Sequence, residues 1–152
     1  MKLFITVKTN KTSKMNRTIQ FRGKAVKCSL FPNGEWVDGY YYEDTIAGIP
    51  RALIKSGELD VIVEPESIGQ FTGLLDKNGK EIYEGDIIRY IDSYEDEYIT
   101  TVRYDESAFV MDVTGCDYDY IAIGWAIDVD VQKLWVVGNI HDNPELLEGG
   151  EK

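Results

Sequence analysis

Hydrophobic and polar residues in the second half of the chain alternate over short stretches that end in turn residues. Residues 87–91, 98–104, 107–113 and 134–140 are rich in Ile, Val, Tyr and Trp, which favour strands. Tight turns separate several of these stretches at a spacing of about ten residues, a pattern typical of a small β-barrel or β-sandwich. Residues 120–131 are apolar but show no clear period, and residues 114–119 are expected to form a loop.

The first half of the chain also favours strands. Residues 18–31 and 35–42 flank Pro32-Asn33-Gly34, and Asn-Gly between two such runs predicts an antiparallel hairpin in which both turn residues have positive φ. Residues 44–56 are expected to be irregular or to form one short helix opened by Pro50. Residues 59–63 predict a strand that ends before Pro65.

Two turns are predicted inside residues 68–90. Asp76-Lys77-Asn78-Gly79 predicts a turn with Asn78 and Gly79 in the left-handed conformation, and Gly85-Asp86 predicts a second turn that leads into a strand. Near the end, Asn143-Pro144 reads as a helix cap and first helical position, followed by one short helical turn.

The charge is unevenly distributed along the 152 residues, whose net charge is −11. Residues 1–34 hold eight of the 16 basic residues and none of the 27 acidic ones, a charge of +8, so residues 35–152 carry −19. The basic segment either contacts nucleic acid or an acidic partner, or lies against the acidic body of its own chain or a neighbour. Repulsion between a body at −19 and a phosphate backbone favours the second interpretation.

Motifs for catalysis or cofactor binding are not found in the sequence. His141 is the single histidine, which excludes a multi-histidine metal site, and neither a GxSxG elbow nor a phosphate-binding glycine loop occurs. Cys28 and Cys116 lack CxxC spacing and are read as unpaired thiols. Acidic clusters that could gather a cation are Asp92, Glu95, Asp96 and Glu97; Asp117 and Asp119; and Asp128 and Asp130. They are interpreted as solvated loops and faces, and neither a metal nor a cofactor is predicted.

An aromatic run, Tyr40-Tyr41-Tyr42 with Trp36 nearby, allows two readings. It is a stacking platform for single-stranded nucleic acid, or it supplies core on one face of a hairpin and an exposed edge on the other. The core or interface reading is favoured.

Three motifs occur in order along the chain, in residues 19–40, 68–86 and 136–147. They resemble signatures of the YopX family of bacteriophage and prophage proteins, and the resemblance runs from about Met15 to Leu147. It implies a mostly-β fold with an SH3-like barrel in the carboxy-terminal part, few short helices, and phage or prophage origin. It brings no established activity and no catalytic residues. The signature residues, which we expect to be structural, are Gly34, Trp36, Gly39, Gly69, Gln70, Thr72, Gly73, Asp76, Asn78, Gly79, Tyr83, Gly85, Asp86, Gly138, Asn139, Asn143 and Pro144.

The sequence therefore predicts four segments: an extension over residues 1–14, a small antiparallel β-rich region over 15–67, the SH3-like region over 68–148, and a tail over 149–152. We expect a non-enzymatic accessory or interaction protein that binds a protein partner or self-associates. No signal peptide or membrane span is recognised, so the cytoplasm of the bacterial host is the expected location. The alternatives are a nucleic-acid-binding module that uses the basic segment, and a cryptic metal-dependent enzyme.

Overall fold

The computed structural model describes residues 18–113, 120–130 and 133–148. The predicted extension over 1–14, the loop over 114–119 and the tail over 149–152 lie outside the described residues. The elements, in chain order, are β1 (Phe21–Lys24), β2 (Trp36–Ile46), β3 (Ile49–Ser56), β4 (Leu59–Val63), the 3-10 turn η1 (Pro65–Ser67), β5 (Gly69–Leu75), β6 (Glu81–Tyr83), β7 (Asp86–Ile91), β8 (Glu97–Asp105), β9 (Ala108–Asp112), β10 (Tyr120–Ala122), α1 (Ile123–Asp130), β11 (Leu134–Asn139) and α2 (Glu145–Glu148).

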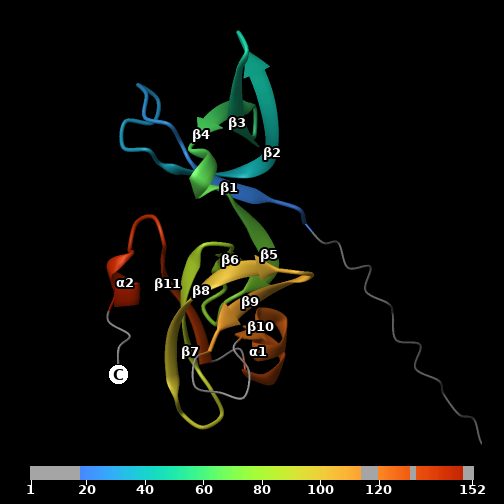
Figure 1. The fold of residues 1–152 in the computed structure, drawn as a ribbon, viewed down its shortest axis with the longest axis vertical. Coiled ribbons are helices and arrows are strands. Elements are labelled where there is room, and N and C mark those ends of the chain that lie inside the picture. Colours follow the sequence, from blue (N-terminus) through green and yellow to red (C-terminus); the bar gives the residue numbers. More distant parts are fainter. Residues whose placement is uncertain (1–17, 114–119, 131–132, 149–152) are drawn as a thin grey trace, which may run out of the picture.

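The strands form two antiparallel sheets, which confirms the mostly-β prediction. One sheet has the order β4-β3-β2-β1-β5-β6 and the other the order β10-β9-β8-β7-β11. In Figure 1, β1 to β4 form an upper lobe, while β6 to β11 and α1 gather in a lower lobe. Strand β5 starts beside β1 and runs down into the lower lobe, so it belongs to both.

The predicted hairpin of β1 and β2 is confirmed as an antiparallel pair, but its turn differs from the prediction. Phe21 pairs with Gly39 and Lys24 with Trp36, so residues 25–35 form a long connection instead of a two-residue turn. Gly34 has a φ of +69°, whereas Asn33 is not among the described residues with positive φ. At the start of this connection the N–H of Ala25 still donates to the carbonyl oxygen of Glu35 at 2.9 Å, and Ala25 also forms a bridge with Val63 of β4.

The prediction for residues 44–56 was wrong. They form the end of β2 and all of β3, joined by a tight turn in which Ala47 and Gly48 have φ values of +52° and +79°. Two successive positive φ values define the type I′ hairpin turn, whose twist matches that of the strands. Pro50 is tolerated in β3 because the pairing of β3 with β4 ends at Ala52. No strand lies beside Pro50 on that side, so its missing N–H costs no hydrogen bond of the sheet.

The four predicted strands of the second half are confirmed as β7, β8, β9 and β11. The unassigned residues 120–131 form β10 and α1 as far as they are described. The SH3-like barrel is not confirmed, because β10 and β11 are the edge strands of the five-stranded sheet and no pairing between them occurs among the described residues.

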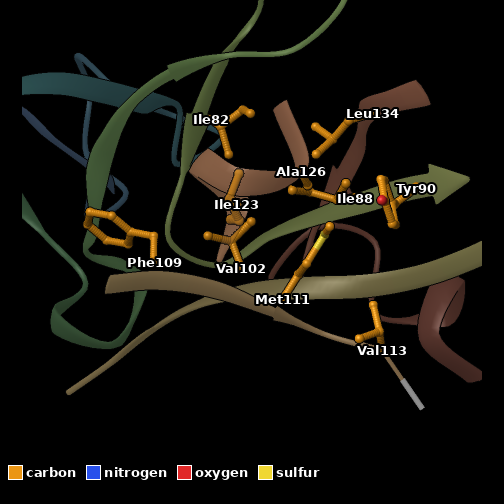
Figure 2. Close-up of a cluster of buried hydrophobic side chains, with 10 residues drawn as sticks. All are labelled: Ile82, Ile88, Tyr90, Val102, Phe109, Met111, Val113, Ile123, Ala126 and Leu134. Atoms are coloured by element: carbon orange, nitrogen blue, oxygen red, sulfur yellow. The ribbon is translucent and has the colours of Figure 1, made fainter. Parts of the chain in front are cut away.

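Each lobe has its own apolar core. The lower core includes Ile88, Met111 and Leu134 from the strands, with Ile123 and Ala126 from α1. Figure 2 shows the α1 side chains among those of the strands. The upper core is smaller and centres on Ala25, Ile54 and Val63.

Candidate interaction site at the junction of the two lobes

Strand β1 presents different residues on its two faces. Phe21 and Ala25 belong to the core of the upper lobe, whereas Arg22 and Lys24 occupy the alternate positions and both form ion pairs with acidic residues of the lower lobe. Because side chains alternate along a strand, one face of β1 builds the upper core and the other faces the junction between the lobes.

Arg22 is the central residue of this junction. Its Nη2 atom lies 2.7 Å from Oδ1 of Asp86 and also donates to the carbonyl oxygen of Glu84 at 3.4 Å. The guanidinium lies 5.0 Å from the ring centre of Trp36 and 4.8 Å from that of Tyr83. Arg22 therefore combines an ion pair with two cation–π contacts, one in each lobe.

Asp86 is almost fully buried, with 1% of its side chain exposed. The glycine turn at Gly85, with a φ of +80°, places the carboxylate so that Oδ2 accepts the backbone N–H of Tyr83 at 2.8 Å. Burial raises the pKa of the Asp86 carboxyl above its ordinary value, and the charge of Arg22 opposes that rise. The turn predicted at Gly85-Asp86 is thus confirmed, and it also supplies the acidic partner of Arg22.

A second polar connection centres on Asp142. Its Oδ1 atom lies 2.7 Å from Nζ of Lys24, and its Oδ2 atom accepts the indole N–H of Trp36 at 2.6 Å. The hydrogen bond with Lys24 is the main reason that the pKa of Asp142 is lowered to about 2. Oδ1 of Asn139 accepts the backbone N–H groups of His141 and Asp142 at 3.0 Å and 2.9 Å, and this holds the loop in place.

Two signature glycines allow close approach of backbone near the junction. A Cβ atom on Gly69 would lie 2.3 Å from the carbonyl oxygen of Glu84, and one on Gly138 would lie 2.6 Å from Oδ1 of Asn143. Real Cβ atoms do not approach oxygen so closely. Position 69 therefore requires glycine because the obstacle is backbone, whereas a larger residue at position 138 would force the Asn143 side chain to move.

The predicted turn at Asp76–Gly79 is present, but its role lies within the lower lobe. Gly79 has a φ of +79°, whereas Asn78 is not among the described residues with positive φ, so only half of the left-handed prediction is correct. The buried carboxylate of Asp76 accepts the backbone N–H groups of Asn78 at 2.7 Å, Lys80 at 2.9 Å and Val136 at 3.0 Å. Asp76 therefore ties the turn to β11.

The structure brings about half of the signature residues together. Those at the junction or its supporting loop are Trp36, Gly69, Gln70, Tyr83, Gly85, Asp86, Gly138, Asn139 and Asn143. Those placed elsewhere are Gly34, Gly39, Thr72, Gly73, Asp76, Asn78, Gly79 and Pro144. The sequence did not identify Arg22, Lys24 and Asp142 as residues of this site. The available signal was the spacing of two between Arg22 and Lys24, which places them on one face of a strand.

A cavity of about 250 Å³ opens beside the junction. Its walls include Glu66 from η1, Glu84 from the turn before β7, Thr101 and Arg103 from β8, and Ile140 and His141 after β11. Arg103 is already paired with Asp105 and, at 3.0 Å, with Asp112. The carboxylates of Glu66 and Glu84 have no hydrogen-bond or ion-pair partner among the described residues, so the cavity carries uncompensated negative charge.

The other candidate residues have ordinary structural roles where they are described. Tyr41 packs on Phe21 with ring centres 5.6 Å apart, while 65% of Tyr40 is exposed, so the aromatic run divides between core and surface. Asp92 caps its own loop by accepting the N–H groups of Tyr94 and Asp96. Glu95 pairs with Lys133, and Glu97 with Arg89. Asp128 lies on an exposed part of α1.

The described residues contain no group of three or more His, Cys, Asp or Glu side chains arranged to hold a metal ion. Cys28 is an exposed free thiol, and Cys116, Asp117 and Asp119 lie outside the described residues. In this part of the chain, no helix is long and apolar enough to span a membrane.

Comparison with known proteins identifies the family to which the chain belongs. The YopX protein family matches residues 9–148. This chain belongs to the YopX family, as the three sequence motifs indicated.

A curated relative is the SPbeta prophage-derived uncharacterized protein YopX of Bacillus subtilis (strain 168). The two are 36% identical over 74 residues, which is 47% of this chain and 53% of that protein, so the match spans about half the length of the relative. The crystal structure of protein yopX from Bacillus subtilis covers 86% of this chain and 98% of its own, with a TM-score of 0.51 and 20% identity. Protein EF1440 from Enterococcus faecalis has a TM-score of 0.48, 23% identity and the same coverage. The similarity to the solved yopX structure supports the fold alone.

Proposed function

We propose that this chain is a non-enzymatic interaction protein of a bacteriophage or prophage, acting in the cytoplasm of the bacterial host. In this proposal the cavity beside the junction receives a basic side chain from a protein partner or from a second copy of the chain. The observation that carries it is that Glu66 and Glu84, whose carboxylates have no partner among the described residues, both line that cavity.

The chemistry of the walls supports recognition of an Arg or Lys side chain. The carboxylates can accept hydrogen bonds from a guanidinium or ammonium group, and Ile68 and Ile140 offer apolar surface to its aliphatic stem. Arg103 does not oppose this, because its charge is already matched by Asp105 and Asp112. The net charge of −11 would also speed the encounter with a basic partner.

The size of the cavity supports a single side chain over a cofactor. Its volume of about 250 Å³ lies below the ~300 Å³ at which small-molecule and cofactor sites usually begin.

Most of the residues that line the cavity belong to the lower lobe, and we infer that this lobe is an SH3-like barrel. The consecutive antiparallel strands β7, β8 and β9, with β11 added beside β7, support that assignment. Since such scaffolds carry many unrelated functions, the assignment itself names no partner.

Titration with arginine amide, followed by amide NMR shifts, tests the proposal. Shifts are expected to saturate and to cluster at Glu84, Gly85, Thr101 and His141, and to weaken as salt is added. A double variant, Glu66→Gln with Glu84→Gln, should lose them, whereas the control Glu58→Gln, in the β3–β4 turn, should keep them. Equal, non-saturating shifts at every surface carboxylate would refute the site.

Nucleic-acid binding through the basic amino-terminal segment is the second candidate. Two of its eight basic residues, Arg22 and Lys24, are paired with Asp86 and Asp142, which leaves less charge for a phosphate backbone. A gel-shift titration at low salt distinguishes the candidates, because phosphate contacts would give binding that falls steeply with salt and is reduced when residues 1–14 are deleted.

A further inference from the structure

One long edge of β2 is open in the upper lobe. Strand β1 pairs with β2 only as far as Phe21 opposite Gly39, whereas the pairing of β2 with β3 continues to Ile46. Gly39 has a φ of +155°, and a Cβ there would lie 2.1 Å from the carbonyl oxygen of Lys55, so the residue at which the pairing with β1 ends requires glycine. In Figure 1 the part of β2 beyond β1 lies at the rim of the upper lobe.

The hydrogen bonds identify which backbone groups face outward. The N–H of Thr45 donates to its neighbour, Oδ1 of Asp44, at 2.7 Å, so it points away from β3. The register between β2 and β3 is unbroken, so Tyr41 and Glu43, two and four residues earlier, face the same way. Among the described residues, no backbone group pairs with this edge.

An open strand edge is a template for another strand, and its charge limits which strand fits. Glu43 and Asp44 make the edge acidic. Pairing of the edge with itself in a second copy would place Glu43 beside Glu43, and like charges directly opposite each other destabilise a sheet. A strand flanked by basic residues is favoured instead.

A sequence of that kind precedes the described residues of this chain. Residues 3–7 are Leu-Phe-Ile-Thr-Val, flanked by Lys2 and Lys8, and residues 1–17 hold five basic residues and no acidic one. We propose that residues 3–7 add as a strand to the open edge formed by Tyr41, Glu43 and Thr45 of the same molecule. Alternation would then place Leu3, Ile5 and Val7 on one face, where they can extend the apolar surface of Tyr41 and Phe21.

The chain is long enough for this docking within one molecule. Residues 8–17 can span up to about 33 Å, whereas the edge extends roughly 20 Å along β2 from the pair Phe21–Gly39. A short flexible tether gives an effective concentration in the millimolar range, which favours docking in the same molecule over exchange between molecules. The family match begins at residue 9, so the docked strand precedes the part that this chain shares with its relatives.

Amide hydrogen exchange of the full chain tests the proposal, read at Tyr41 and Glu43 because the Thr45 amide already has a side-chain acceptor. Deletion of residues 1–14 should speed exchange at these two amides by about tenfold or more. In the full chain Ile5→Pro should have the same effect, because proline cannot donate to the ladder, while Asn10→Pro, in the tether, should not. Glu43→Lys should raise exchange at Tyr41, while Glu58→Lys, in the β3–β4 turn, should leave it unchanged.

Two results would overturn the inference. One is equal exchange at Tyr41 and Glu43 in the full and deleted chains. The other is protection that rises with protein concentration together with a doubled mass in light scattering, which would assign the edge to a second copy.

Discussion

Arg22 and Asp86 join the two lobes through an ion pair of 2.7 Å in which the carboxylate is 1% exposed and the guanidinium side chain 14%. The two residues are far apart in the sequence, and each also contacts Tyr83: Arg22 by its position over the ring and Asp86 by accepting the backbone N–H. The packing of the lobes thus depends on a charge pair shielded from water.

Asp86→Ala should destabilise the protein strongly. It leaves the charge of Arg22 buried without its partner and removes the acceptor of the Tyr83 amide, and loss of one member of a buried pair typically costs about 3–5 kcal/mol. Glu97→Ala breaks the exposed pair with Arg89 and should cost at most about 1 kcal/mol. Urea unfolding of both variants measures the difference, and equal losses would contradict a special role for the buried pair.

The Asp142 carboxylate should make the protein sensitive to acid. Its pKa falls from an ordinary value of 3.8 to about 2 in the folded chain, so its contribution to stability is fully present above about pH 4 and is lost as the pH falls toward 2. The difference in unfolding free energy between the wild type and Asp142→Asn should therefore shrink over this range.

The same pH series in a Lys24→Met background provides the control for Asp142. Because the hydrogen bond from Lys24 is the main cause of the lowered pKa, the pH-dependent part of the difference should become smaller there. An unchanged pH dependence would show that Lys24 is not the cause.

Gly69→Ala should destabilise the junction by about 1–3 kcal/mol, because the added methyl group would overlap the carbonyl oxygen of Glu84 and the backbone of β5 must shift. Gly124→Ala is the matched control, because that position lies in α1 and the nearest atom to the new Cβ is 4.0 Å away. The control should be neutral or slightly stabilising, by up to about 1 kcal/mol. Thermal unfolding measures both variants, and similar shifts would argue against close approach at Gly69.

Asp76→Ala should cost about 2–4 kcal/mol, since three backbone N–H groups lose a charged acceptor in a buried position. Asp76→Asn should recover part of the loss, because one amide oxygen remains as an acceptor. Exchange of the Val136 amide should accelerate in both variants. An unaffected Val136 amide would show that the tie between the turn and β11 contributes little.

Short-range sequence patterns predicted the strands well where a run of strand-favouring residues was bounded by turn residues. The strands at β7, β8, β9 and β11 and the turn at Gly85-Asp86 follow from local alternation and glycine positions. The strands in residues 44–56 were not predicted, because Pro50 suggested a helix start and the Ala47-Gly48 turn lacks the usual Asn-Gly sequence. In α1, exposed Trp125 and Val129 obscured the helical period.

The candidate site was less predictable because it is built from contacts that are distant in the sequence. The partners of Arg22 and Lys24, Asp86 and Asp142, lie in the far half of the chain, and nothing in the local sequence selects them from the 27 acidic residues. The cavity walls come from η1, β8 and the loop after β11, so they meet only after both lobes are folded.

Strand β5 pairs with β1 at Gly69 and Gln70 and with β6 farther along. Two lobes that share a strand cannot swing as independent bodies, because any hinge between them would break the ladder. Unfolding by denaturant should therefore occur in a single cooperative transition. Cutting the chain before β5 would leave each fragment with an unpaired edge, so neither lobe is expected to survive alone.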